Sequence, residues 1–377
     1  MGASGPHDMI RDTVRRYARE HLRPHAAQWD RESRFPREAL AELGRMGLAG
    51  VAVPEDWGGA GMDHTSLAIV IEELAAGDGA TSTIVQVNNL AAGILLGYGS
   101  AAQKERWLKP IARGEALGAF ALTEPHTGSD ASAITTRAER CDAGWRLNGV
   151  KQFITSGKNA DLAIVFAVTD RAAGKKGISA FVVPTDTPGY VVARIEEKSG
   201  QHASDTAQLL FDNCIVPAQN LLGEAGIGYR IALANLESGR INVAAQSVGM
   251  AQSALEAALA YSRERRTFGK PLLEHQAVNF RLADMATQIE AGRQLYLHAA
   301  RLRDAGAPCL KEASMAKLFA SEMAEKVCSD AIQIHGGYGY VSDFPVERIW
   351  RDVRVTKIYE GASDIQRLVI GRAIAGE

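Results

Sequence analysis

The residue best placed for acid–base chemistry is Glu360, in the segment RDVRVTKIYEGASDIQRLVIGR that covers residues 351–372. Small residues follow it, and the next amphipathic helix is expected to begin directly afterwards. A carboxylate in such a loop, beside Tyr359 and Ile358, loses contact with water, which raises its pKa and makes it a useful general base. A lone glutamate among 44 acidic residues is nevertheless most often solvent-facing.

Two other segments place hydroxyl and aromatic side chains at the ends of expected strands. FALTEPHTGSD, residues 120–130, leaves hydroxyls and free backbone N–H groups in a turn where an anion or the edge of a flavin can dock. KQFITSGKNAD, residues 151–161, offers the aromatic face of Phe153 and the hydroxyl of Thr155 as a wall for a flat cofactor. Taken alone, they are also typical of a capped turn and a core phenylalanine.

Two later segments have the chemistry of phosphate binding. RERRTFGKPLLEHQ, residues 263–276, contains Arg265, whose guanidinium can donate two parallel hydrogen bonds to phosphate oxygens. QIHGGYGY, residues 333–340, has consecutive glycines that allow a positive φ and a close backbone approach. A solvated basic helix end and an ordinary glycine-rich helix end would look the same.

The elements that position these segments fall into three regions. Residues 1–118 show apolar positions at helical spacing, with helices expected at 36–47, about 63–76 and 100–111. Residues 119–226 contain short runs rich in β-branched and aromatic residues, typical of an antiparallel sheet or small barrel. Residues 227–377 return to long helices. The sequence thus predicts an α+β protein that is mostly α, with an N-terminal helical domain, a middle antiparallel β domain and a C-terminal four-helix bundle.

One helix of the third region has the apolar spacing of a bundle seam. Its steps of 4, 3, 4, 3, 4 and 3 residues place one face against its neighbours. The seam residues are Val278, Leu282, Met285, Ile289, Gly292, Tyr296 and Ala299.

Composition and missing motifs exclude several classes of protein. Lys plus Arg count 42 and Asp plus Glu 44, and the net charge of −2 disfavours nucleic-acid binding. No metal site is expected, because the four cysteines form no Cys-x-x-Cys pair and His21 and His25 lack a third ligand nearby. The dinucleotide, P-loop, zinc-protease and α/β-hydrolase motifs are all missing. Without an apolar membrane run or a secretory signal, the expected location is the cytoplasm.

Together the five segments resemble the acyl-CoA dehydrogenase family, and the resemblance covers essentially the whole chain. IYEG and IQRL near the C-terminus match most closely. The resemblance implies FAD as cofactor and Glu360 as the catalytic base. It implies FAD contacts from Phe120, Leu122, Thr123, Ser129, Phe153, Ile154, Thr155, Arg265, Phe268, Gln276, Gln333, Gly336, Gly337, Ala362, Ser363 and Asp364. It also implies acyl-CoA contacts from Ser129, Glu237, Ser238, Gly239, Arg240, Tyr359 and Gly361.

The chain departs from the family pattern at two positions. Phe153 stands where the family usually has Trp, and Ala362 where it most often has Thr, so we expect a tuned flavin environment with activity retained. A third position narrows the choice of base. Some relatives place their base just before the arginine of the segment LESGRINVAAQSVG, and here that residue is Gly239, which leaves Glu360 as the only candidate.

The implied reaction is α,β-dehydrogenation of an acyl-CoA thioester, with electrons passed to an electron-transfer flavoprotein. The resemblance also implies a homotetramer in which Arg265 and residues 333–337 reach the flavin of a neighbouring subunit. TSTIVQVNNL (81–90) and EEKSGQHASDTAQLLFD (196–212) resemble bacterial short-chain and short branched-chain members. We expect butyryl-like substrates, with isobutyryl- or 2-methylbutyryl-CoA as close competitors. An acyl-CoA oxidase and a non-catalytic flavin-binding scaffold remain alternatives.

Overall fold

The computed structural model describes residues 5–376 and begins with a helical region. Asp63 and Asp78 start the two longest helices of this region, because their carboxylates accept hydrogen bonds from Ser66 N (2.7 Å) and Thr81 N (2.8 Å). The second of these helices is buried on almost every side. The helices are α1 (Pro6–Tyr17), α2 (Arg23–Glu32), α3 (Arg37–Arg45), α4 (His64–Gly77), α5 (Gly79–Tyr98), α6 (Ala101–Gln103) and α7 (Lys109–Ala112).

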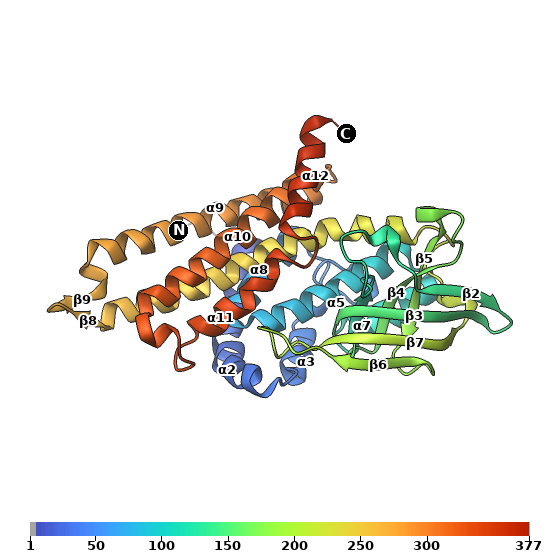
Figure 1. The fold of residues 1–377 in the computed structure, drawn as a ribbon, viewed down its shortest axis with the longest axis horizontal. Helices are drawn as coiled ribbons and strands as arrows, with labels where there is room; N and C mark the ends of the chain where they lie inside the picture. Colours follow the sequence, from blue (N-terminus) through green and yellow to red (C-terminus); the bar gives the residue numbers. More distant parts are fainter. Residues whose placement is uncertain (1–4, 377) are drawn as a thin grey trace.

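The middle region is a curled β sheet at one end of the molecule (Figure 1). Its strands are β1 (Gly118–Ala121), β2 (Arg137–Cys141), β3 (Gly144–Thr155), β4 (Leu162–Val168), β5 (Ile178–Pro184), β6 (Tyr190–Ile195) and β7 (Thr206–Val216). The order is β1-β4-β2-β3-β7-β6, with β5 also paired to β4. Most pairings are antiparallel, as expected, but β4 runs parallel to β1 and β2.

The C-terminal region consists of long helices and one small hairpin. They are α8 (Gly228–Glu264), β8 (Arg266–Thr267), β9 (Lys270–Pro271), α9 (Gln276–Asp304), α10 (Leu310–His335), α11 (Val346–Val353) and α12 (Ser363–Ala375). The predicted seam is confirmed on α9, where Leu282, Met285, Ile289 and Tyr296 are buried. Helices α8, α9 and α10 pack on one another, whereas α12 projects from the bundle (Figure 1).

Helix α8 connects the two ends of the molecule. It begins against β5, where a Cβ on Gly228 would lie 2.6 Å from the backbone of Ser179, and it ends at the β8–β9 hairpin. At 1.5 Å per residue its 37 residues span about 55 Å. Within the described residues, no helix combines the length and apolar character needed to cross a membrane.

Candidate active site

Glu360 lies in a tight loop between a 3-10 turn (Arg354–Lys357) and α12. Its φ is +54° and that of Gly361 is +91°, so two successive residues adopt left-handed conformations. Such a conformation is unfavourable for a glutamate and is found where the surrounding structure imposes it, often at functional sites. The loop turns the Glu360 carboxylate onto α8, where a Cβ on Gly239 would lie 2.5 Å from Oε2. Gly239 therefore makes room for the carboxylate.

Buried polar groups hold this loop in place. Gln366 Nε2 donates to the carbonyl oxygens of Gly361 (2.8 Å) and Glu360 (3.2 Å), and Lys317 Nζ donates to the Gly361 oxygen (2.8 Å). The Tyr359 hydroxyl donates to Gln246 Oε1. Sequence reasoning missed Lys317, Gln246 and Gln366. Gln366 stands inside the IQRL match, but no local pattern distinguishes Lys317 or Gln246 from other polar residues of long helices.

The electrostatics of the Glu360 carboxylate suit a base. Oε2 is buried and has no hydrogen-bond partner among the described residues. Burial raises the pKa of Glu360 to about 7, although the nearby positive charges of Arg240 and Lys317 oppose this rise. A carboxylate with a pKa near neutrality is poised to accept a proton at physiological pH. The backbone N–H of Glu360 also makes no hydrogen bond within residues 5–376.

The predicted substrate residues 237–240 lie on α8, the helix that faces the Glu360 carboxylate. Arg240 is buried, and its Nη1 donates to Ser314 Oγ at 3.3 Å. Glu237 instead pairs with Arg303 at 3.2 Å and accepts a hydrogen bond from the thiol of Cys309. Ser238, which follows Glu237 in the sequence, is partly buried. The structure therefore brings Gly239 and Arg240 to the base, while the Glu237 side chain contacts α9 and the start of α10.

The predicted wall for a flat cofactor forms where the turn after β1 meets β3. Gln152 N donates to the Thr123 carbonyl at 2.9 Å, which joins the two segments. Phe153 follows with a φ of +59° and a side chain that is 62% exposed, at a register shift between β3 and β7. An exposed aromatic ring beside a turn rich in hydroxyls fits one face of an isoalloxazine ring.

The other predicted residues of this wall differ in exposure. Leu122 and Ile154 are buried, and Phe120 packs edge-on against Phe166. Thr155 is partly buried and Ser129 is exposed.

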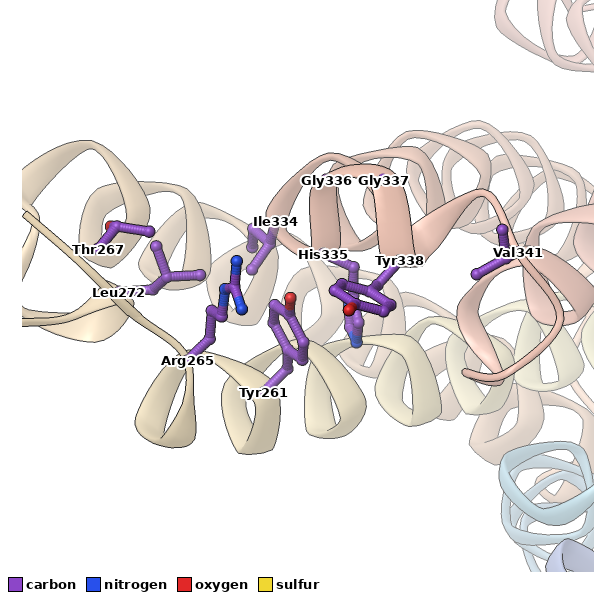
Figure 2. A pocket seen from close by; sticks show the side chains of 10 residues that line it. All are labelled: Tyr261, Arg265, Thr267, Leu272, Ile334, His335, Gly336, Gly337, Tyr338 and Val341. Atoms are coloured by element: carbon purple, nitrogen blue, oxygen red, sulfur yellow. The ribbon is translucent and has the colours of Figure 1, made fainter.

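A second group of predicted cofactor residues surrounds a pocket of about 490 Å³ at the far end of α8 (Figure 2). Arg265 lies beside Tyr338, with its guanidinium carbon 5.9 Å from the ring centroid. Gly336 has a φ of +60°, and a Cβ on Gly336 or Gly337 would meet no atom within 4 Å. Open space beside glycines and an exposed guanidinium fit a phosphate. Phe268, at the hairpin tip, is 97% exposed, and Gln276 and Gln333 are also exposed.

The remaining predicted cofactor residues, 362–364, lie at the start of α12, next to the base. Ala362 is the N-cap of the helix, and it cannot cap with its side chain. Ser363 is buried and Asp364 is exposed.

Family models match almost all of this chain. The N-terminal, middle and C-terminal domain models of the acyl-CoA dehydrogenases match residues 4–115, 119–214 and 226–375, respectively. The chain belongs to the acyl-CoA dehydrogenase family. The helix, β, helix order predicted from the sequence is confirmed by this match and by the fold.

Individual relatives are similar over most or all of their length. The mitochondrial short-chain specific acyl-CoA dehydrogenase of Rattus norvegicus is 47% identical over 97% of this chain and 89% of its own length. The structure of butyryl-CoA dehydrogenase from Megasphaera elsdenii superposes with a TM-score of 0.96 at 40% identity, covering 100% of this chain and 99% of that one. A chain from a study of the electron transferring flavoprotein of Acidaminococcus fermentans superposes with a TM-score of 0.98 at 43% identity, covering both chains completely.

Within one copy of this acyl-CoA dehydrogenase, the two groups of predicted FAD residues lie far apart. Strand β3, which carries Phe153, belongs to the sheet at the end of the molecule where α8 begins, whereas Arg265 directly follows the last residue of α8, a helix about 55 Å long (Figure 1). Gly239, and with it the carboxylate of Glu360, lies only about 17 Å along α8 from its start. The group at Phe153 suits the isoalloxazine ring and the group at Arg265 suits the phosphates. A single chain does not bring both groups to the same FAD molecule.

Proposed function

We propose that this protein is a short-chain acyl-CoA dehydrogenase that converts a butyryl-like acyl-CoA to the trans-2-enoyl-CoA. The observation that carries the proposal is the Glu360 carboxylate, which is buried and unpartnered at Oε2 and packed against Gly239, with a pKa of about 7. Such a group can remove the weakly acidic α-proton of a thioester. The named activities of the Rattus norvegicus and Megasphaera elsdenii relatives support the same reaction.

The residues around Glu360 divide the chemistry between them. FAD, when bound, supplies an acceptor for the β-hydrogen as hydride. The free backbone N–H of Glu360 is placed to donate to the thioester carbonyl, which acidifies the α-carbon. Gly239 leaves space for the acyl group beside the carboxylate, and Thr123 and Phe153 orient the flavin. Holding base and flavin on opposite sides of one acyl chain lowers the barrier by orientation.

Polar residues beside the base support a short acyl chain. The two stretches that resemble short-chain and short branched-chain members meet there, since Thr83 Oγ1 donates to Gln201 Oε1 at 2.7 Å. Gln246 Nε2 donates to Thr83 Oγ1 at 2.7 Å and links both to Tyr359. Long apolar chains would have to displace this buried network, leaving its groups unpaired.

The proposal extends to the site residues, partners and location. FAD contacts are assigned to 120, 122, 123, 129, 153–155, 265, 268, 276, 333, 336, 337 and 362–364, and acyl-CoA contacts to 129, 237–240, 359 and 361. The chain divides into domains 1–118, 119–226 and 227–377. The assembly is a homotetramer, electrons leave to an electron-transfer flavoprotein, and the protein works in the cytoplasm.

Anaerobic addition of butyryl-CoA to the purified protein tests the function. We expect a yellow flavin spectrum that bleaches, and no bleaching in Glu360→Gln. A bound flavin that responds only to isobutyryl- or 2-methylbutyryl-CoA would assign a branched substrate. Rapid oxygen uptake during turnover would indicate an oxidase, and a folded protein that binds no FAD would indicate a scaffold.

A further inference from the structure

Lys317 is a buried charge that the reaction outlined above does not use. It lies on α10, its side chain has no exposed surface, and its only hydrogen bond within the described residues is to the Gly361 carbonyl. No carboxylate of residues 5–376 lies within 4.0 Å of Nζ. Burying an ammonium group without a direct ionic partner is costly, so packing alone would favour an apolar residue of similar length.

Anchoring the loop does not by itself account for this lysine. Gln366 Nε2 donates to the same Gly361 oxygen at the same distance of 2.8 Å and also holds the Glu360 carbonyl. Lys317 therefore adds what the neutral amide cannot supply, a positive charge one residue away from the base. Because Lys317 does not contact the carboxylate, Oε2 keeps its lone pairs free for a proton.

The charged groups that act on Glu360 come from two elements, α8 and α10. Arg240 faces it from α8 and Lys317 from α10, while the adjacent Tyr359 phenol is neutral because burial raises its pKa to about 12. α12 contributes the neutral amide of Gln366. Glu237 and Glu322, the other carboxylates that act on Arg240 and Lys317, are paired with Arg303 and Arg367, respectively. Burial lowers the pKa of Lys317 to about 8, so it still carries most of its charge at neutral pH.

We propose that Lys317 is a positioning residue for the base, which fastens the Glu360 loop and supplies the positive charge that keeps the buried carboxylate ionised. This inference rests on the proposed function, because it concerns how Glu360 becomes a base near neutral pH. It predicts that removing the charge at position 317 changes the pH at which Glu360 ionises, and also weakens the attachment of the loop.

The test compares Lys317→Met with Lys326→Met, an exposed lysine on the same helix that pairs with Asp330. In Lys317→Met we expect the acid limb of kcat/KM for butyryl-CoA to move to higher pH, so that the loss at pH 6 exceeds the loss at pH 9 by roughly tenfold. Lys326→Met should keep the original profile. Lys317→Gln retains a hydrogen-bond donor without the charge and should show the same shift of the acid limb. It replaces Lys317→Met in the test if the methionine variant does not fold.

A second measurement needs no turnover. Infrared titration of the protonated carboxyl band, assigned by its absence in Glu360→Gln, should give a higher midpoint in Lys317→Met. An unchanged midpoint, or a loss of activity equal at every pH, would overturn the proposal. If the unaltered protein does not oxidise butyryl-CoA, the proposed function fails, while the infrared titration still decides the role of Lys317.

Discussion

At the scale of single residues, the site depends on how closely Gly239 and Glu360 approach each other. A Cβ at position 239 would lie 2.5 Å from Oε2 and 2.9 Å from Cδ of Glu360. The helix backbone cannot retreat, because Gly239 belongs to the buried part of α8. The only group that can yield is the carboxylate, which must then leave the position from which it reaches the substrate.

Gly239→Ala is therefore expected to lower kcat/KM for butyryl-CoA by roughly 10- to 100-fold, the equivalent of about 1–3 kcal/mol of overpacking. FAD content should not change, because the Cβ added at Gly239 would meet the Glu360 side chain and no predicted cofactor residue. Steady-state kinetics and the flavin absorbance of the same preparation provide the measurement. Unaltered kinetics would show that the carboxylate works from another position.

The same scale gives a pH prediction for the base. Burial raises the pKa of Glu360 to about 7, and only the ionised form accepts a proton. As the pH falls below 7 the carboxylate becomes protonated, so kcat/KM for the free enzyme should decrease about tenfold per pH unit on the acid side. Glu360→Gln should reduce kcat by roughly 10²–10⁴-fold and abolish this limb. A profile flat from pH 5 to 8 would exclude Glu360 as the base.

At the scale of elements, a buried ion pair holds the strand ends of the middle region together. Lys151 Nζ donates to Glu124 Oε1 at 2.8 Å and to the Leu122 carbonyl at 2.9 Å. The Glu124 carboxylate also accepts hydrogen bonds from the backbone N–H groups of Thr135 and Thr136. These contacts lower the pKa of Glu124 to about 2 despite its burial. One carboxylate thus ties β1, β3 and the turn before β2 together.

Lys151→Met should destabilise the protein by about 3–5 kcal/mol at pH 7, because it leaves a buried carboxylate without its partner. The native pKa of Glu124 is depressed, so the pair stabilises the fold fully above the pKa of the unfolded group and loses this effect as the pH falls toward 2. The defect of Lys151→Met should accordingly shrink in acid. Thermal melts from pH 8 down to about pH 2.5 measure it, and the double variant with Glu124→Gln should recover part of the loss at neutral pH. Equal losses at all pH values would contradict this account.

The elements also show which features the sequence could predict. The α9 seam was predictable because one face of that helix is exposed and the apolar spacing is therefore visible. Helix α5 was not predicted: it is buried on almost every side, and its polar residues, such as Asn88 and Asn89, bond to neighbouring backbone, so no periodic stripe appears. Glu360 was found through its motif, whereas Lys317 is distinguished only by contacts between residues 44 positions apart.

At the scale of the whole molecule, the two groups of predicted FAD residues lie too far apart along α8 for one chain to bring both to the same FAD. The base packs against Gly239 near the start of α8, at the end of the molecule that holds the sheet with Phe153, and Arg265 with Gly336 and Gly337 lies at the other end of α8 (Figure 2). If one FAD contacts both groups, Arg265 must belong to a different copy from the Glu360 that serves the same flavin. In an assembly that mixes an Arg265 variant with a Glu360 variant, the two substitutions can then affect different active sites.

Co-expression of two inactive variants tests this arrangement. Arg265→Ala should weaken FAD binding by the loss of a charge-assisted phosphate contact, about 1.5–3 kcal/mol, and Glu360→Gln should be inactive. In a mixed assembly, a site that takes Glu360 from the first variant and Arg265 from the second is intact, so activity should return at low FAD concentration to roughly a quarter of the unaltered value, given random mixing. Mixing the purified variants without exchange of subunits is the control and should restore nothing. Co-expressed assemblies as inactive as their parents would place Arg265 and Glu360 at the same site within one chain, which the length of α8 opposes.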